Sequence, residues 1–317
     1  MSDLSHADAT ATATAETAAP AVQEAEPTVG KPRSLAIDAL MELRRSPIFL
    51  ISATMILLVV TMALFPGLFT DADPRHTDLA NKYLMKPSYG DVFDEGWLGY
   101  DGQSYSIWAR MVHGTRASLM VGLLTTLISF ALGVITGMLA GFYGGWVDTV
   151  LSRIVDIFMA IPFLLGAMVI LTPFEVTNPM VVVFVLSFFG WTLVARVMRG
   201  SVITVKQQDY VAAARALGAG TGRILMKHIL PNAISPAIVI ATISLGGYIG
   251  AEAVLSFLGV GLEAPTISWG MDINSGGQYI RNAPHVIFWP SLILSFTILA
   301  FIMLGEAVRD AFDPKSR

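Results

Sequence analysis

Residues 207–232, QQDYVAAARALGAGTGRILMKHILPN, form a short polar stretch between two long apolar stretches of the chain. The stretch carries charges of both signs and is too polar to cross a membrane. Asp209 is placed to cap a helix that begins at Tyr210, and Gly218 is suited to end that helix in a left-handed conformation. A second helical stretch is expected from Ile224 to Ile229. The sequence therefore predicts two short helices folded around a glycine-rich turn.

Two interpretations of this helix pair follow from its residues alone. In the first, the pair presents Val211, Ala214 and Leu217, beside Arg215, to a groove on a partner protein. In the second, it is an amphipathic loop that lies on the membrane surface. The composition of the stretch does not decide between them.

The rest of the chain is rich in apolar residues that occur in long runs. Of its 317 residues 54% are hydrophobic and 14% charged, whereas roughly 25% are charged in an ordinary soluble domain. A helix needs about 20 mainly apolar residues to cross a bilayer. The sequence therefore predicts an all-α membrane protein with six transmembrane helices. Their expected limits are 47–66, 117–141, 147–172, 180–199, 231–257 and 286–307.

Lysine and arginine are distributed unevenly between these stretches. The cytoplasmic flanks of membrane spans carry an excess of both residues. Because basic residues flank the first span, the segment 200–230 and the end of the last span, we expect both termini and that segment to be cytoplasmic. The segment 67–116 is mainly acidic, and we expect it to form an external loop. The basic residues are Lys31, Arg33, Arg44, Arg45, Arg196, Arg199, Lys206, Arg215, Arg223, Lys227, Arg309, Lys315 and Arg317.

The N-terminal region differs in composition from everything that follows it. Residues 1–30 are mostly Ala, Thr, Asp, Glu, Pro and Val and have no large apolar face. Such a segment cannot bury enough surface to offset the entropy of ordering. We expect residues 1–34 to be a disordered cytoplasmic tail and residues 35–317 to form the transmembrane domain. The tail lacks the basic start and apolar stretch of a signal peptide.

Glycine and proline inside the expected spans predict how the helices pack. Gly133, Gly137 and Gly141 place three small residues on one face of a helix, where a neighbouring backbone can approach closely. Pro162 removes a backbone donor from the third span and should bend it. The bend serves either a gating motion or the shape of the bundle. Gly246 and Gly250 predict close packing in the fifth span as well.

Charged residues within the spans are candidates for function, because burying charge in a membrane is costly. Glu252 lies in an apolar stretch and must be protonated or find a donor, so it is either a structural hydrogen-bonding group or part of a transport pathway. Arg153 and Asp156 are spaced to form a local ion pair rather than a transport site. Glu306, Arg309 and Asp310 are expected to form a cluster at the membrane interface.

Several classes of protein are not supported by the sequence. It has no phosphate-binding loop with a Gly-Lys-Ser/Thr end, and GAGTGR at Gly218–Arg223 has neither its spacing nor its lysine. The five histidines are scattered and there is no cysteine, so neither a metal site nor a disulfide is predicted. There is no basic patch with interleaved aromatic residues of the kind that binds nucleic acid.

The stretch 207–232 is similar to the coupling loop of ABC importer permeases, known as the EAA motif. The first Glu of that motif corresponds to position 212, where this chain has Ala. We expect Ala212 to be the third residue of a helix capped by Asp209, so a capping-box hydrogen bond of about 1 kcal/mol is lost. The matching residues are Ala213, Ala214, Gly218, Leu230 and Pro231.

The resemblance extends over about residues 40–317 and is to the C-type permease subunit of dipeptide and oligopeptide importers. GAEAVLSFLGVGLEAPTISWG at Gly250–Gly270 and LAFIMLGEAVRDAFDPKSR at Leu299–Arg317 resemble two characteristic stretches of that branch. The approach to the second span matches more loosely. There, Gly99, Asp101, Arg110, Gly114, Arg116, Ser118 and Leu119 fit, whereas Tyr100, Ser104, Tyr105 and Ser106 depart.

The resemblance implies a type I ABC importer permease fold and a chain that is not an enzyme and carries no cofactor. It implies peptide import across a bacterial inner membrane with a homologous B-type permease, two ATP-binding subunits that hold ATP and Mg, and an extracytoplasmic substrate-binding protein. An importer of nickel, glutathione or another small solute, a secondary transporter and a membrane scaffold are the alternatives. The implied ATPase-coupling residues are Asp209, Tyr210, Ala213, Ala214, Arg215, Leu217, Gly218, Leu230 and Pro231.

Overall fold

The computed structural model describes residues 43–90, 92–174 and 178–312. The chain divides into two units, Met1–Ser34 and Leu35–Arg317, and the structure described below belongs to the second unit. The tail expected at residues 1–34 lies outside the described residues. So do Lys31, Arg33, Lys315 and Arg317, which were named above, and residues 313–317 at the end of the quoted stretch Leu299–Arg317.

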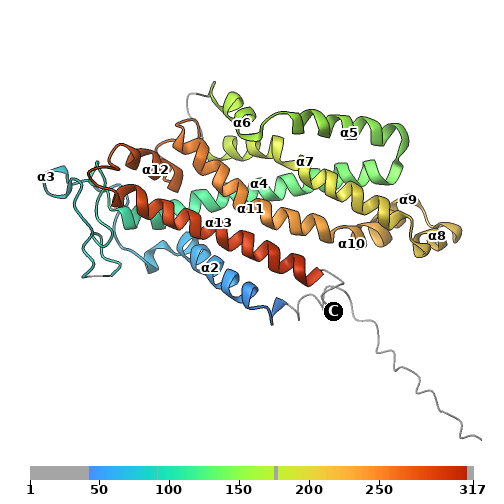
Figure 1. Ribbon diagram of the computed structural model, residues 1–317, viewed down its shortest axis with the longest axis horizontal. Coiled ribbons are helices and arrows are strands. Elements are labelled where there is room, and N and C mark those ends of the chain that lie inside the picture. Colours follow the sequence, from blue (N-terminus) through green and yellow to red (C-terminus); the bar gives the residue numbers. More distant parts are fainter. Residues whose placement is uncertain (1–42, 91, 175–177, 313–317) are drawn as a thin grey trace, which may run out of the picture. The chain divides into compact units, whose positions relative to one another are not determined.

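The described residues are predominantly helical, as the sequence predicts (Figure 1). Five helices are long and apolar enough to cross a membrane, and a bent pair of helices makes a sixth span if it is counted as one. The five are α2 (Pro47–Leu64), α4 (Ile107–Tyr143), α7 (Pro179–Lys206), α11 (Ser235–Phe257) and α13 (His285–Phe312). The shorter elements are η1 (Pro66–Leu68), α3 (Leu79–Lys82), α5 (Gly145–Ala160), α6 (Phe163–Leu171), α8 (Asp209–Ala216), α9 (Thr221–Ile224), the π-helical η2 (Leu225–Ile229), α10 (Leu230–Ala233) and α12 (Trp269–Gly277).

The third expected span, 147–172, is not one continuous helix. It consists of α5 and α6, which are bent by 80° relative to each other. Pro162 lies between them and has no N–H to continue the hydrogen bonds of α5, so Ile161 bonds back to the Phe158 carbonyl instead. The bend expected from Pro162 is therefore present, and it is large enough to divide the span into two helices.

The second span begins ten residues earlier than the expected 117, at Ile107. The Ser106 side chain caps it by accepting a hydrogen bond from the Ala109 N–H at 3.2 Å. The start was placed too late from the sequence, because the charged Arg110 in the first turns of α4 is not expected inside a membrane span. The structure buries Arg110 against a carboxylate from α12. The external loop expected at 67–116 is accordingly shorter at its C-terminal end.

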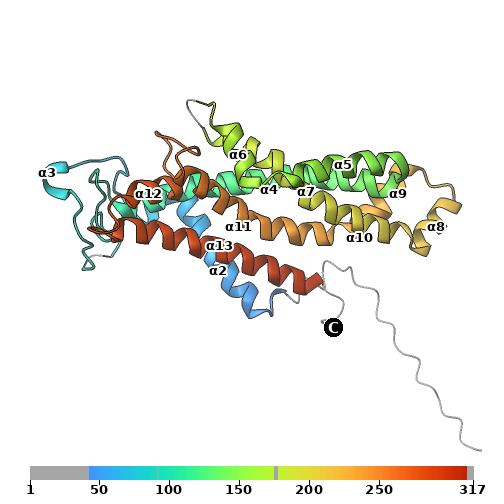
Figure 2. The ribbon, with the colours of Figure 1, turned by 45° about the horizontal axis from the view of Figure 1, so that its top comes forward.

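The glycines of α4 pack against α7, as predicted, and the two helices lie side by side (Figures 1 and 2). A Cβ added at Gly133 would lie 2.8 Å from the Trp191 carbonyl oxygen, and one at Gly141 would lie 2.8 Å from that of Arg199. These distances leave no room for a larger residue. A Cβ at Gly246 would likewise lie 3.0 Å from a carbonyl oxygen of α13, which confirms the close packing expected there.

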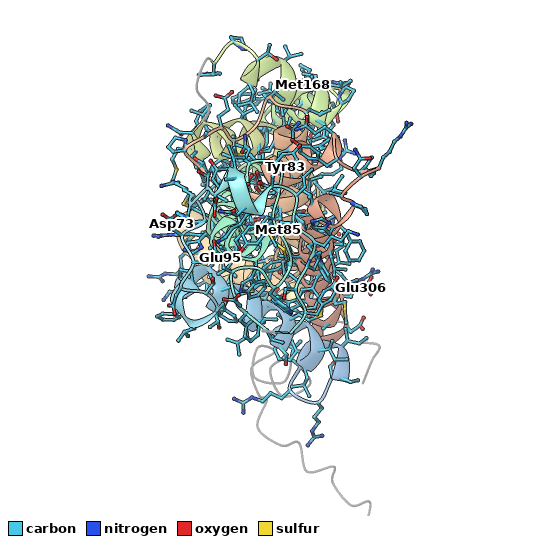
Figure 3. All side chains as sticks on the ribbon, turned by 90° about the vertical axis from the view of Figure 1, so that its left-hand side faces the viewer. Asp73, Tyr83, Met85, Glu95, Met168 and Glu306 are labelled. Carbon is cyan, nitrogen blue, oxygen red and sulfur yellow. The ribbon has the colours of Figure 1, made fainter. Side chains whose placement is uncertain are left out.

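The segment between α2 and α4 covers the end of the bundle that also carries α12. Figure 3 looks onto this end, where Tyr83, Met85 and Glu95 lie. Lys82 donates to Glu95 at 2.7 Å, and Trp108 of α4 donates to the Phe69 carbonyl at 2.9 Å. The first contact holds the segment together, and the second fixes it to α4.

Candidate functional site

The residues between α7 and α11 form a helical hairpin at the end of the bundle opposite α3 and α12 (Figures 1 and 2). In this segment, here called the 207–231 hairpin, α8 is followed by a glycine-rich turn and then by α9, η2 and α10 without interruption. The prediction of two helical stretches around a turn is confirmed. The second stretch begins at Thr221, three residues before the expected Ile224.

The start of α8 differs from the expectation by one residue. Gln208 has extended backbone angles, and its carbonyl accepts hydrogen bonds from Val211 and Ala212 at 3.0 and 3.2 Å. Gln208 is therefore the N-cap, and Asp209 is the first helical residue rather than the capping one. Its carboxylate still lies favourably at the positive end of the helix dipole. The capping-box argument fails, because Ala212 is the fourth helical residue and not the third.

The end of α8 is as predicted. Gly218 has a φ of +80°, in the left-handed region where glycine is favoured. Its N–H bonds to the Arg215 carbonyl at 3.0 Å, and the Ala219 N–H bonds to the Ala214 carbonyl at 3.0 Å. This pair of hydrogen bonds is a Schellman motif, which satisfies carbonyls that the helix end would otherwise leave free.

One residue expected to face a partner faces inward instead. Val211 is buried and belongs to a cluster with Ile224, Leu225 and Ile229 from the second half of the hairpin and Val202 of α7. The hairpin folds back on itself, so one face of α8 must cover the other arm. Val211 therefore anchors the hairpin to the bundle.

The outward surface of the hairpin contains most of the other predicted coupling residues. Leu217 is 87% exposed and Tyr210 43%, and Arg215 is also exposed. Met226 of η2 is 59% exposed as well and was missed by the sequence reasoning. Leu225 and Ile229, four residues apart, both face inward, and this spacing was the available signal that Met226 faces outward. Of the remaining coupling residues, Asp209, Ala213, Gly218 and Pro231 are exposed, and Ala214 and Leu230 are half-buried.

Three basic residues near the end of α7 connect this helix to α4 and α5. Arg199 donates two hydrogen bonds to Asp148 of α5, at 2.5 and 2.7 Å. Lys206, the last residue of α7, donates to the carbonyl of Phe142 in α4 and lies over its ring. Arg196 lies 3.1 Å from Asp156. A displacement of the hairpin would therefore be transmitted by α7 to both neighbouring helices.

The local ion pair predicted for α5 is present but long. Arg153 and Asp156 lie 3.8 Å apart, and both side chains are largely exposed. Arg196 of α7 is the nearer partner of Asp156. Exposed pairs of this kind contribute little to stability, and of these two pairs Arg196–Asp156 is the one that joins α5 to α7.

Glu252 of α11 has the donors that the sequence requires for a buried carboxylate. It is fully buried and accepts hydrogen bonds from Ser118 of α4 at 3.0 Å and from Ser256 at 2.8 Å. The Ser256 hydroxyl in turn accepts the Leu262 N–H at 2.9 Å. Glu252 thus joins α4, α11 and the segment that follows α11.

A second buried charge cluster lies at the α3 and α12 end and was not identified from the sequence. Asp272 of α12 accepts a hydrogen bond from Arg110 at 2.7 Å, and the Arg110 guanidinium lies over the Tyr105 ring. Burial raises the pKa of Asp272 to about 6, although Arg110 opposes this effect. Burial also raises the pKa of Asp101, against the hydrogen bonds that Tyr105 and Gln103 donate to it. Tyr105 departs from the family pattern, but its backbone N–H donates to Asp101, a residue that matches that pattern.

In the part of the chain that the structure describes, no group of three or more His, Asp or Glu side chains is placed to hold a metal ion. The features that stand out are an anchored hairpin, whose outer surface carries exposed Leu217 and Tyr210 beside charged Asp209 and Arg215, and a set of long helices linked to its ends.

Comparison with known proteins places this arrangement in a known context. Residues 133–317 match the family model described as binding-protein-dependent transport system inner membrane component. The oligopeptide transport system permease protein OppC of Bacillus subtilis (strain 168) is 35% identical over 303 residues, which cover 95% of this chain and 97% of that protein. The glutathione transport system permease protein GsiD of Pectobacterium atrosepticum is 39% identical over 244 residues, 74% of this chain and 81% of that protein.

A solved structure shares the fold. The MetNI methionine ABC transporter in inward-facing conformations contains a chain that aligns with a TM-score of 0.52 and 21% sequence identity. The alignment covers 64% of this chain and 96% of that one. At this level of identity the likeness concerns the fold alone.

Proposed function

This chain belongs to the family of binding-protein-dependent transport system inner membrane components, the non-catalytic permease subunits of ABC importers, and from this membership we propose that it imports peptides. Membership makes it a multi-pass inner membrane protein that works with ATPase and binding-protein partners. It also agrees with the expectation that the chain is not an enzyme and carries no cofactor.

The cargo is proposed from the relatives described above. An oligopeptide permease aligns with this chain over almost the whole length of both proteins. The second relative is a permease for glutathione, itself a small peptide with a free thiol. Peptides are the cargo chemistry that these two relatives have in common. Import of glutathione is the second candidate, and the identity of 39% favours testing it alongside ordinary peptides.

The 207–231 hairpin is the proposed contact with an ATPase subunit. The observation that carries this proposal is the division of its apolar residues, with Val211 buried against the bundle and Leu217 87% exposed. An apolar side chain at the tip of an anchored hairpin fits a groove on a partner. The proposed contact residues are Asp209, Tyr210, Ala213, Ala214, Arg215, Leu217, Gly218, Leu230 and Pro231, to which the structure adds Met226.

The mechanism proposed is rigid-body transmission. Closure of two ATPase subunits would move the hairpin, and α7 and α11, which it joins, would tilt with their neighbours between inward and outward openings. A homologous B-type permease would complete the pathway. The basic residues that flank the hairpin and the terminal spans support a cytoplasmic location for the hairpin and for both termini.

Affinity purification from a bacterial membrane tests the proposal. The chain should bring down two ATP-binding subunits and a second permease, and the purified assembly should hydrolyse ATP faster when a peptide-loaded binding protein is added. Vesicles containing the assembly should accumulate peptide with ATP and without an ion gradient. Uptake that is driven by an ion gradient alone would instead support a secondary transporter. Isolation of the chain without ATPase subunits would contradict the proposal.

A further inference from the structure

A cleft of about 440 Å³ lies where α5 and α6 meet, facing the middle of α7 and of α11. This volume lies within the range of small-ligand sites, about 300–1,000 Å³. In both views α6 turns away from the bundle at this point (Figures 1 and 2), and Figure 3 shows its Met168 at the edge of the bundle. The cleft is lined by Phe158, Met159, Ile161, Pro162, Phe163, Phe189, Gly190, Thr192, Leu193, Ser244, Gly247 and Tyr248.

The break in the helix constrains what can fill this cleft. α5 ends at Ala160, and Ile161 and Pro162 are both exposed. A helix end leaves its last carbonyls without intrahelical partners, and Pro162 brings no N–H to replace them. Irregular backbone at membrane depth is tolerated only where protein covers it or where it lines a water-filled cavity. Lipid chains are therefore a poor occupant of this part of the cleft.

The hydroxyl groups of the cleft also argue against lipid as its occupant. The Tyr248 hydroxyl donates to the Gly190 carbonyl at 2.9 Å, and the Thr192 hydroxyl donates to the Phe189 carbonyl at 3.3 Å. The Thr192 hydroxyl has used its proton and keeps acceptor capacity for a donor from outside the protein. The Tyr248 oxygen is already hydrogen-bonded by the hydroxyls of Ser129 and Ser244, so Ser244, which also lines the cleft, has likewise used its proton and keeps acceptor capacity. The cleft therefore offers acceptors to a ligand that carries N–H groups.

The lining is also uncharged and partly aromatic. None of the residues that line the cleft carries a charge, and Phe158, Phe163 and Phe189 provide apolar surface beside the hydroxyl groups. Such a surface contacts peptide N–H groups and apolar side chains without selecting for one charge. This combination is suited to the neutral backbone that all peptides share.

We propose that this cleft lines the route of the cargo through the membrane and that the hydroxyl groups of Thr192 and Ser244 accept hydrogen bonds from the peptide backbone. The inference rests on the proposed function, because it takes the cargo to be a peptide. A lipid acyl chain or a side chain of the second permease would fill the cleft in the competing explanations. Neither an acyl chain nor an apolar side chain would use the acceptor capacity of the hydroxyls.

Cysteine labelling tests this directly, because the chain contains no cysteine of its own. Thr192→Cys and Ser244→Cys each place a thiol in the cleft. Leu57→Cys is the control, because Leu57 lies on α2 outside the cleft and is 66% exposed. The complete importer is reconstituted in lipid vesicles with its binding protein and ATP and is treated with a charged, membrane-impermeant thiol reagent. The reagent is applied without peptide, with penta-alanine and with S-methylglutathione, which has neither a free thiol nor a disulfide that could exchange with the cysteine.

The two cleft thiols should react much faster than Leu57→Cys. At a peptide concentration about ten times the half-saturating one, their labelling should slow about tenfold, because the occupied cleft excludes the reagent. Protection by penta-alanine or by S-methylglutathione identifies which of the two occupies the cleft. Reaction no faster than that of Leu57→Cys would overturn the inference in favour of lipid or the second permease. Fast reaction that neither peptide slows would overturn it as well.

The proposed function is tested separately by ATP-driven peptide uptake through the cysteine-free importer. Normal uptake combined with inert cleft thiols overturns the inference that the cleft lines the route of the cargo and leaves the proposal of peptide import intact. Absence of uptake overturns peptide import, and with it the assignment of the hydroxyls to a peptide backbone, even where the thiols show that the cleft holds water.

Discussion

Glu252 shows how a carboxylate is accommodated among membrane-spanning helices. The sequence required a donor for it, and the structure provides two hydroxyl donors, Ser118 from α4 and Ser256 from α11. Because Ser256 also binds the Leu262 backbone, the carboxylate stabilises the point where α11 ends and the chain turns. This contact pattern supports the structural interpretation of Glu252 that was left open from the sequence.

Replacement of Glu252 should destabilise the chain in proportion to the hydrogen bonds that are lost. Glu252→Ala removes both acceptors and leaves a void, which should cost about 2 kcal/mol or more, whereas Glu252→Gln keeps the shape and an acceptor. Thermal unfolding in detergent should rank the midpoints as wild type, Gln and then Ala. Glu306→Ala, at an exposed position on α13, is the matched control and should unfold like wild type. Equal midpoints for wild type, Glu252→Gln and Glu252→Ala would show that the hydrogen bonds of Glu252 contribute nothing to stability.

Asp272 gives the fold a dependence on pH. Its pKa is about 6 in the folded protein against an ordinary value of 3.8, because burial penalises the ionised form. The folded state therefore binds the proton more tightly than the unfolded state. The contribution of this group to stability is full below pH 3.8 and is lost as the pH rises through 6. The difference corresponds to about 3 kcal/mol.

Asp272→Asn should remove most of this dependence. The variant is expected to be less stable than wild type overall, because the Arg110 guanidinium loses its partner. The informative quantity is the change in unfolding free energy between pH 4 and pH 7, measured by chemical denaturation in detergent. The unfolding free energy should fall steeply between these two pH values in wild type and less steeply in the variant. In the variant the raised pKa of Asp101 still contributes in the same direction. Parallel pH profiles would contradict this account of Asp272.

The residue-level errors of the sequence reasoning have a common physical origin. Successive residues of a helix are separated by about 100° around its axis, so a small uncertainty in position changes which face a side chain occupies. The cap expected at Asp209 falls at Gln208, one residue away, and this alone removes the capping-box argument for Ala212. Val211 was assigned outward because the sequence does not reveal that the two arms of the hairpin pack against each other.

Among the elements, the 207–231 hairpin was the most predictable, because its signals are local. Gly218 adopts the left-handed conformation that was expected, and Gly220, two residues later, has an ordinary φ of −65°. A Cβ at either position would meet nothing within 4 Å. The two glycines therefore differ in backbone conformation and not in available space.

This difference allows a matched test of the hairpin. Gly218→Val forces a β-branched residue into a left-handed conformation, at a cost of about 1–2 kcal/mol, and should deform the tip of the hairpin. Gly220→Val needs no such conformation and serves as the control. At equal expression, Gly218→Val should lose peptide uptake while ATP hydrolysis continues, and Gly220→Val should keep both. Normal uptake by Gly218→Val would argue that the shape of the tip does not matter.

The broken third span was only partly predictable. Apolar residues on both sides of Pro162 indicate a continuous span, and proline indicates a bend without giving its angle. The angle depends on packing, because a Cβ at Gly166 would lie 2.7 Å from the Phe189 ring of α7. α6 can approach α7 this closely only after the turn at Ile161 and Pro162. Sequence patterns report which residues are apolar but not which distant ring they meet.

On the scale of the whole molecule, composition and periodicity predicted an all-α membrane protein, and the small residues of α4 predicted a close contact with a neighbouring helix, which the structure shows to be α7. What they could not predict are partners that are far apart in the chain. Arg110 and Asp272 are separated by 162 residues and meet only because α12 folds back over α4. For this reason the charge cluster at the α3 and α12 end was found from the structure, whereas the hairpin was found from the sequence.

The central claim is that the 207–231 hairpin lies in the cytoplasm and transmits the motion of ATPase subunits to the spans. Leu217→Cys places a single thiol at its exposed tip, and Leu79→Cys places one on α3 at the other end, where Leu79 is 60% exposed. Treated with an impermeant thiol reagent, intact cells should label Leu79→Cys alone, and permeabilised cells should label both.

The decisive measurement is cross-linking of Leu217→Cys in the assembled importer. A short thiol-directed cross-linker is predicted to join Leu217→Cys to an ATP-binding subunit, with a yield that changes between ATP-bound and nucleotide-free states, while Leu79→Cys forms no such product. Labelling of Leu217→Cys in intact cells, or an assembled importer in which it cross-links to no ATP-binding subunit, would contradict the account.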